Sequence, residues 1–74
     1  MAFTIESSSR GKPTKSEDTS NRHTAMKIAR AMRDELDGRC SESVVSVRGD
    51  RGVLGYWRGS PEIGWHSADP NTEG

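Results

Sequence analysis

The spacing of apolar and polar positions predicts one long helix over residues 19–38. Apolar residues recur there at intervals that form a single stripe at 3.6 residues per turn. The stripe consists of Ala25, Ile28, Ala29, Met32 and Leu36. Side chains able to cap the first turn precede it, and Gly38 follows where a left-handed C-cap residue is wanted. The pattern predicts an amphipathic helix with Ile28 and Met32 at the centre of its core contact.

Around this helix, alternation with a period of two predicts short strands. Phe3 and Ile5 alternate with polar residues, and the second half of the chain is rich in β-branched and aromatic residues separated by turn residues. The expected strands cover residues 2–7, 43–48, 53–58 and 63–66, and the last three form a meander. We expect an α+β fold of order β-α-β-β-β, with one helix packed on a small curled antiparallel sheet and the first strand at an edge or closing the curl.

Two segments contain too few apolar residues to form a packed structure of their own. Residues 8–18 are rich in serine and lysine, and we expect a mobile loop there. A solvated connector is one interpretation of its basic residues, and an arm that touches phosphate or an acidic surface is the alternative. Residues 67–74 are polar and are expected to form a frayed tail. The chain is therefore expected to be a single domain over residues 1–66 with a mobile loop.

Composition narrows the class of protein. Hydrophobic residues make up 30% of the 74 residues, so the core must be small. Eleven basic and eleven acidic residues cancel, which argues against a protein held to nucleic acid mainly through phosphates and against an acidic DNA mimic. The charges are uneven, since residues 1–33 hold seven basic and three acidic residues, whereas residues 34–74 hold four and eight.

The sequence predicts a cytoplasmic chain. It has one cysteine and hence no internal disulfide, which fits a reducing compartment. It also lacks a signal-peptide pattern and any run of about 18 apolar residues, so we expect no membrane partner.

No constellation of residues predicts catalysis or metal binding. His23, His66 and Cys40 are one ligand short of a zinc site and lack paired spacing. No Gly-x-Ser-x-Gly elbow occurs, and the glycines after residue 48 suit hairpin turns better than a phosphate loop. The integrin-type tripeptide at residues 48–50 is interpreted as turn chemistry. We expect a protein that is not an enzyme and has no cofactor.

The helix is predicted to carry two groups of charges outside the stripe, with Lys27, Arg30 and Asp34 opposite it and Arg33 along one flank. The basic group consists of Lys27, Arg30 and Arg33, and the acidic helix end consists of Asp34, Glu35 and Asp37. Carboxylates at a helix C-terminus oppose the dipole at a cost of about 0.3–1 kcal/mol each. Because broken local rules concentrate at functional sites, the acidic helix end is a candidate contact surface, with a solubilising helix end as the alternative.

A second candidate surface lies in the last hairpin, at Tyr56, Trp57 and Arg58. Adjacent residues of a strand point to opposite faces, so at most one of the two aromatic residues belongs to a core on one side of the sheet. The other is either packed at the rim, a hot-spot residue of a protein interface, or a platform for stacking bases.

The helix Ala25-Met26-Lys27-Ile28-Ala29, with Val45-x-Val47, Gly52-x-Leu54-x-Tyr56 and Gly64-Trp65, resembles small phage-encoded anti-CRISPR proteins. The likeness is to type I inhibitors in which a curled antiparallel sheet wraps one helix, and it covers about residues 20–66. The chain departs from them in its loop before the helix, at residues 38–43 and in its tail.

The resemblance implies a non-enzymatic inhibitor in the host cytoplasm that binds backbone subunits of a CRISPR surveillance complex and blocks target DNA recognition. The expected partner-binding residues are Lys27, Arg30, Arg33, Asp34, Glu35, Asp37, Tyr56, Trp57 and Arg58. A small nucleic-acid-binding module is the alternative, with the basic helix face on phosphates and a sheet aromatic on bases. A regulator of some other host enzyme is a third.

Overall fold

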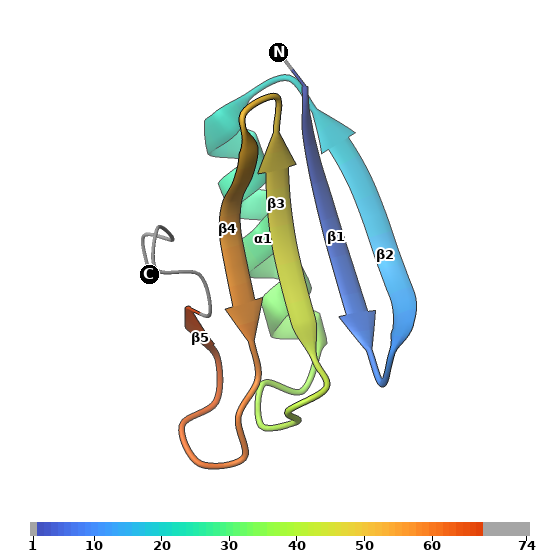
Figure 1. Ribbon diagram of the computed structural model, residues 1–74, viewed down its shortest axis with the longest axis vertical. Helices are drawn as coiled ribbons and strands as arrows, with labels where there is room; N and C mark the ends of the chain where they lie inside the picture. Colours follow the sequence, from blue (N-terminus) through green and yellow to red (C-terminus); the bar gives the residue numbers. More distant parts are fainter. Residues whose placement is uncertain (1, 68–74) are drawn as a thin grey trace.

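A single antiparallel sheet with one helix across one face makes up residues 2–67, the part of the chain that the computed structural model describes (Figure 1). The elements are β1 (Phe3–Ser9), β2 (Lys12–Thr19), α1 (Arg22–Glu35), β3 (Val44–Gly49), β4 (Gly52–Arg58) and β5 (His66–Ser67). In the sheet the strands follow the order β2-β1-β3-β4-β5. The predicted α+β class, with one helix on a small curled antiparallel sheet, is confirmed.

The segment expected to be a loop at residues 8–18 is part of a β-hairpin instead: it contains the end of β1, the turn and most of β2. β2 pairs with β1 from Phe3 opposite Thr19 to Ser9 opposite Lys12, and this makes the element order β-β-α-β-β-β. The hairpin turns through Arg10 and Gly11, whose φ angles of 55° and 77° are those of a tight type I′ turn. Every residue of β2 is exposed or half-buried, so its side chains carry no apolar signal. The strand is therefore held in the sheet by its backbone pairing with β1 and not by burial of its side chains.

The expected position of the first strand is also corrected, because β1 lies inside the sheet between β2 and β3. The expected meander is confirmed, although its last strand is β5 and not residues 63–66. Ile63 lies in the preceding turn with 69% of its surface exposed. The expected frayed tail, from residue 68 onward, lies outside the described residues.

The helix α1 is shorter at both ends than the sequence predicts, since it covers Arg22–Glu35 and not residues 19–38. Asn21 is the N-cap, and its side-chain Oδ1 accepts a hydrogen bond of 3.1 Å from the backbone N–H of Thr24. The backbone N–H of Leu36 closes the last turn on the carbonyl of Met32. Gly38 has no left-handed conformation and lies beyond the cap. No helix among residues 2–67 is long and apolar enough to cross a membrane.

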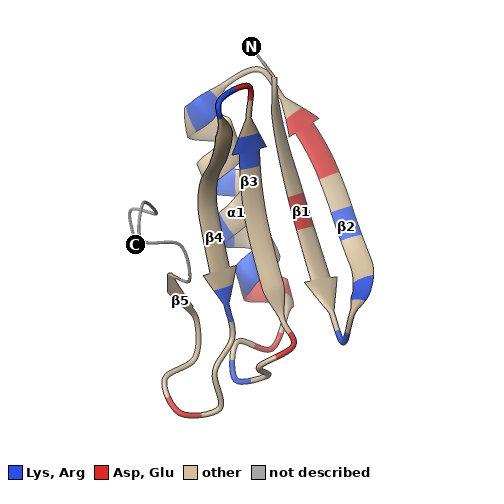
Figure 2. Ribbon diagram, viewed as in Figure 1, with Lys and Arg blue, Asp and Glu red and all other residues tan. Residues whose placement is uncertain are grey.

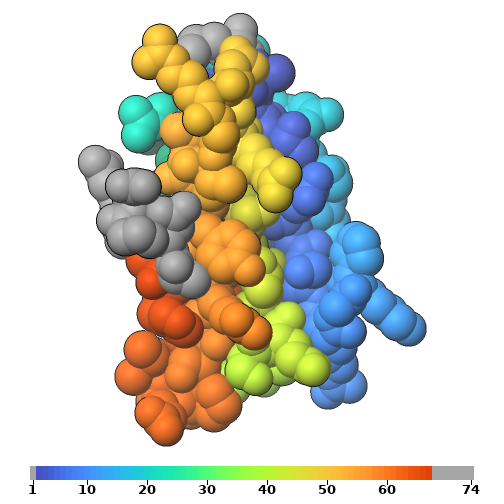
Figure 3. All heavy atoms as spheres, in the orientation of Figure 1, coloured from blue at the N-terminus to red at the C-terminus, as the bar shows by residue number. Residues whose placement is uncertain are grey.

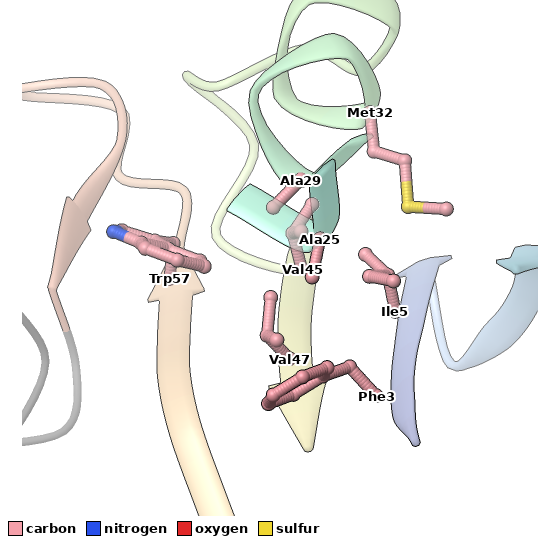
Figure 4. Close-up of a cluster of buried hydrophobic side chains, with 8 residues drawn as sticks. All are labelled: Phe3, Ile5, Ala25, Ala29, Met32, Val45, Val47 and Trp57. Atoms are coloured by element: carbon pink, nitrogen blue, oxygen red, sulfur yellow. The ribbon is translucent and has the colours of Figure 1, made fainter. Parts of the chain in front are cut away.

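The core lies between α1 and the sheet face that the helix covers (Figure 4). Its buried members are Phe3 and Ile5 of β1, Ala25, Ala29 and Met32 of α1, Val45 and Val47 of β3, and Trp57 of β4. The helical contribution includes two alanines, whose small side chains let the helix axis approach the sheet. Ile28, expected at the centre, is half-buried and packs against the edge of this cluster, whereas Met32 is 1% exposed.

Candidate functional site

The outer surface of α1 presents the charged residues that the sequence placed opposite the apolar stripe. Lys27, Arg30 and Asp34 are exposed on the side away from the sheet, and Glu35 is exposed at the border toward β2, where it pairs with Lys15. We call this surface the helix ridge, and it consists of Lys27, Arg30, Asp34 and Glu35. Figure 2 shows basic residues along most of the helix and acidic residues at its C-terminal end. The ridge therefore changes sign along its length.

Two carboxylates of the acidic helix end already have partners within the chain. Glu35 lies 3.6 Å from the ammonium group of Lys15 on β2, and both side chains are largely exposed. Asp37 is exposed beyond the helix, where its Oδ1 accepts a hydrogen bond of 2.9 Å from the backbone N–H of Arg39. Asp37 therefore orders the following loop, and Asp34 and Glu35 form the acidic end of the ridge itself.

Arg33 belongs to the core boundary and not to the ridge. Its guanidinium carbon lies 4.8 Å from the centre of the Trp57 ring, a cation–π geometry. The pKa of Arg33 is lowered, chiefly by burial and then by the neighbouring charge of Arg30, while Asp34 opposes the shift. Its backbone carbonyl accepts a hydrogen bond of 2.9 Å from the indole N–H of Trp65. The expectation that Arg33 faces a partner is therefore replaced by a packing role.

The structure decides which of the two adjacent aromatic residues is buried. Trp57 lies opposite Val45 on the helix face of the sheet and is 2% exposed, so its prediction as a partner-binding residue is wrong. The ring contacts the position of Gly55, where any Cβ would collide with it. A glycine at that point makes room for the indole. Trp57 therefore has no exposed ring on which a base or a partner side chain can stack.

Tyr56 and Arg58 lie on the opposite, open face of the sheet, which Figure 3 shows. Tyr56 is half-buried and stands across from Ser46, and Arg58 is exposed. The Nε of Arg58 donates a hydrogen bond of 2.9 Å to the carbonyl of Ser41. The expected site residues therefore divide between two faces of the molecule and do not form one site.

The open face also has a shallow hollow over β2, β1 and β3. Its volume is about 220 Å³. Small side chains account for it, because four of its lining residues are serines. Its main lining residues are Glu6, Ser8, Pro13, Ser16, Val44 and Ser46. Its charged lining residues are one carboxylate, Glu6, and one ammonium group, Lys15, so the hollow has no cluster of titratable groups suited to catalysis.

The remaining reactive residues are scattered over the described part of the chain. Among residues 2–67 no group of three potential metal ligands comes together. Cys40 is half-buried with a free thiol, and His23 and His66 lie on different elements. Asp50 and its neighbour Arg51 form the exposed turn between β3 and β4, as the sequence predicts.

In comparisons with known proteins, no family model, curated protein or solved structure matches this chain.

Proposed function

We propose that this protein is a non-enzymatic inhibitor of the anti-CRISPR kind, which binds a CRISPR surveillance complex through its helix ridge and blocks target DNA recognition. The observation that carries the choice of a protein partner is the change of sign along the ridge. Lys27 and Arg30 lie on the same exposed surface as Asp34, and Glu35 borders it on the side of β2. A protein surface offers both signs of charge, whereas a phosphate backbone attracts one half of this ridge and repels the other.

The sequence resemblance supplies the class of partner. The backbone subunits of a surveillance complex hold a guide nucleic acid and therefore present basic residues to it. The acidic end of the ridge suits such a surface, and its two basic residues suit carboxylates beside it. The site of action is then the cytoplasm of the host cell.

The burial of Trp57 weakens the alternative of a nucleic-acid-binding module. That alternative uses three basic helix residues for phosphates and a sheet aromatic for stacking. Trp57 is in the core with Arg33 packed over it, and Tyr56, the aromatic that remains for stacking, lies on the sheet face opposite the helix and its basic residues. Lys27 and Arg30 then provide little more than a pair of phosphate contacts.

The test reverses each half of the ridge separately. One variant carries K27E and R30E, and the other carries D34K and E35K, while D50K in the distant β3–β4 turn is the control for a change of charge. Inhibition is measured as phage survival in cells with an active type I CRISPR system, beside a mobility-shift assay on single- and double-stranded DNA. D34K alone is included because it keeps the Lys15–Glu35 ion pair.

Docking on a protein predicts that both ridge variants lose inhibition at least tenfold, that D50K does not, and that none of the proteins shifts DNA. Nucleic-acid binding predicts opposite effects, with K27E/R30E abolishing the shift and D34K/E35K strengthening it. Failure of the wild-type protein to protect phage from any type I system contradicts the proposed function.

A further inference from the structure

The outer edge of β2 is the longest strand edge that residues 2–67 leave without a neighbouring strand. β2 stands at one end of the sheet and pairs on one side only, with β1. Its eight residues extend about 27 Å at roughly 3.4 Å per residue, and seven of them are exposed. At the other end of the sheet β5 has two residues. The unpaired N–H and C=O groups of a long edge are a template for another strand.

The side chains of this edge carry opposite charges close to its centre. Lys15 and Glu17 stand opposite Ser7 and Ile5 of β1, both buried, so the two charged side chains share the helix face of the sheet. They flank Ser16, which points to the open face. Along β2 the order is Lys15, Ser16, Glu17. A second copy of β2 that runs antiparallel presents the reverse order, so each lysine can face a glutamate of the other copy.

Two-fold symmetry limits the ways in which two copies of β2 can pair. In an antiparallel pair, directly opposed residues point to the same side of the sheet. A two-fold axis perpendicular to the sheet therefore brings one residue opposite its own copy. An axis at Lys15 opposes two ammonium groups, and an axis at Glu17 opposes two carboxylates. An axis at Ser16 instead places Lys15 of each copy opposite Glu17 of the other.

We propose that the protein forms a homodimer in which β2 pairs antiparallel with β2 of a second copy about Ser16. The two sheets then join into one, with both helices on the same side. Two cross-strand ion pairs form at once because the interface is symmetric. Thr14 adds no regular pair, because it is skipped where the β1–β2 register shifts and its hydroxyl is hydrogen-bonded to that of the buried Ser7.

The same strand contains features that limit this dimer to a weak one. Pro13 has no N–H to donate, and the register of the β1–β2 pair shifts next to it, between Ser7 and Ser8. Continuous pairing about Ser16 is therefore confined to about three residues, from Lys15 to Glu17. Lys15 keeps its neighbour Glu35, so in the dimer its ammonium group lies between two carboxylates. These features favour a reversible association at high micromolar concentration.

The test is sedimentation velocity of the full chain from 10 µM to 1 mM, with three single variants and one double variant. K15E and E17K each place like charges opposite one another, whereas K15E/E17K restores two opposite pairs with the signs exchanged. K12E is the matched control, because it makes the same change of charge on the same strand outside the paired centre. Circular dichroism of each variant checks that the fold is kept.

The proposal predicts a concentration-dependent dimer for the wild type and for K12E. It further predicts a dissociation constant raised at least tenfold in K15E and E17K, and recovery to within about threefold of wild type in the double variant. In NMR spectra of the wild type, amide shifts that move with concentration should be confined to β2. A wild-type protein that stays monomeric at 1 mM overturns the proposal, and so does equal weakening by K12E and K15E.

Discussion

The guanidinium group of Arg33 lies over the indole ring of Trp57, with 4.8 Å between its central carbon and the ring centre. One residue is from the helix and the other is from β4, so the contact fastens α1 to the sheet beside the core, in which Figure 4 shows the Trp57 ring. The guanidinium group also covers one face of the ring. Arg33, which the sequence placed among the partner-binding residues, therefore stabilises the packing of α1 on the sheet.

The first prediction follows from this contact. Arg33→Ala removes both the cation–π interaction and the cover over the ring, so we expect a loss of about 1–2 kcal/mol in the free energy of unfolding. Arg30→Ala, one turn earlier on the exposed ridge, is the control and should change it by less than about 0.5 kcal/mol. Urea denaturation measures both, and equal effects of the two variants contradict the packing role of Arg33.

The helix and the meander could be predicted because burial leaves a period in the sequence. Ala25, Ala29 and Met32 are spaced for one helix face, and Val45 and Val47 alternate, and all five are buried in the structure. β2 left no such period because none of its residues is buried. Its one local signal is the pair Arg10-Gly11, which suits a two-residue hairpin turn.

The second prediction concerns this turn. Arg10 has a φ of 55°, which asparagine adopts more readily than arginine does. Arg10→Asn should therefore stabilise the protein by a few tenths of a kcal/mol. Gly11→Ala, at a φ of 77° with open space around the new methyl group, should destabilise it by about 1 kcal/mol from backbone strain alone. Thermal unfolding measures both, and an unchanged melting temperature in Gly11→Ala contradicts a formed hairpin.

The candidate site could be predicted only in part, for a related reason. A helical period fixes which residues lie opposite the stripe, so the exposed positions of Lys27, Arg30 and Asp34 were predictable from spacing. Alternation along a strand separates Tyr56 from Trp57 without saying which of them is inside. That choice depends on the long-range register of β4 against β3, where Trp57 meets Val45.

The third prediction separates the two residues expected at the centre of the core. Met32 is 1% exposed, whereas Ile28 is half-buried at the edge of the cluster. Met32→Ala should cost about 2–4 kcal/mol, and Ile28→Ala about 1–2 kcal/mol. In a domain whose stability is about 3–5 kcal/mol, Met32→Ala is expected to be substantially unfolded at 37 °C, whereas Ile28→Ala is not. Circular dichroism at that temperature distinguishes them, and the reverse order contradicts the placement of the helix on the sheet.

The last prediction concerns Gly38 and Trp65, which pack together where the chain leaves the helix. A Cβ built at Gly38 lies 2.6 Å from Cδ1 of the Trp65 ring, so Gly38→Ala forces the indole to move. The movement strains the hydrogen bond of 2.9 Å from the indole N–H to the carbonyl of Arg33. We expect a loss of about 1–3 kcal/mol.

A double-mutant cycle assigns this loss to the contact. In a Trp65→Ala background the ring is absent, so Gly38→Ala should cost less than about 0.5 kcal/mol, and the coupling between the two positions should exceed about 1 kcal/mol. Backbone strain at Gly38 is excluded as a cause, because its φ is not positive. Additive effects of the two substitutions in urea denaturation contradict the close approach of Trp65. In that case the glycine serves the loop after the helix and not the ring.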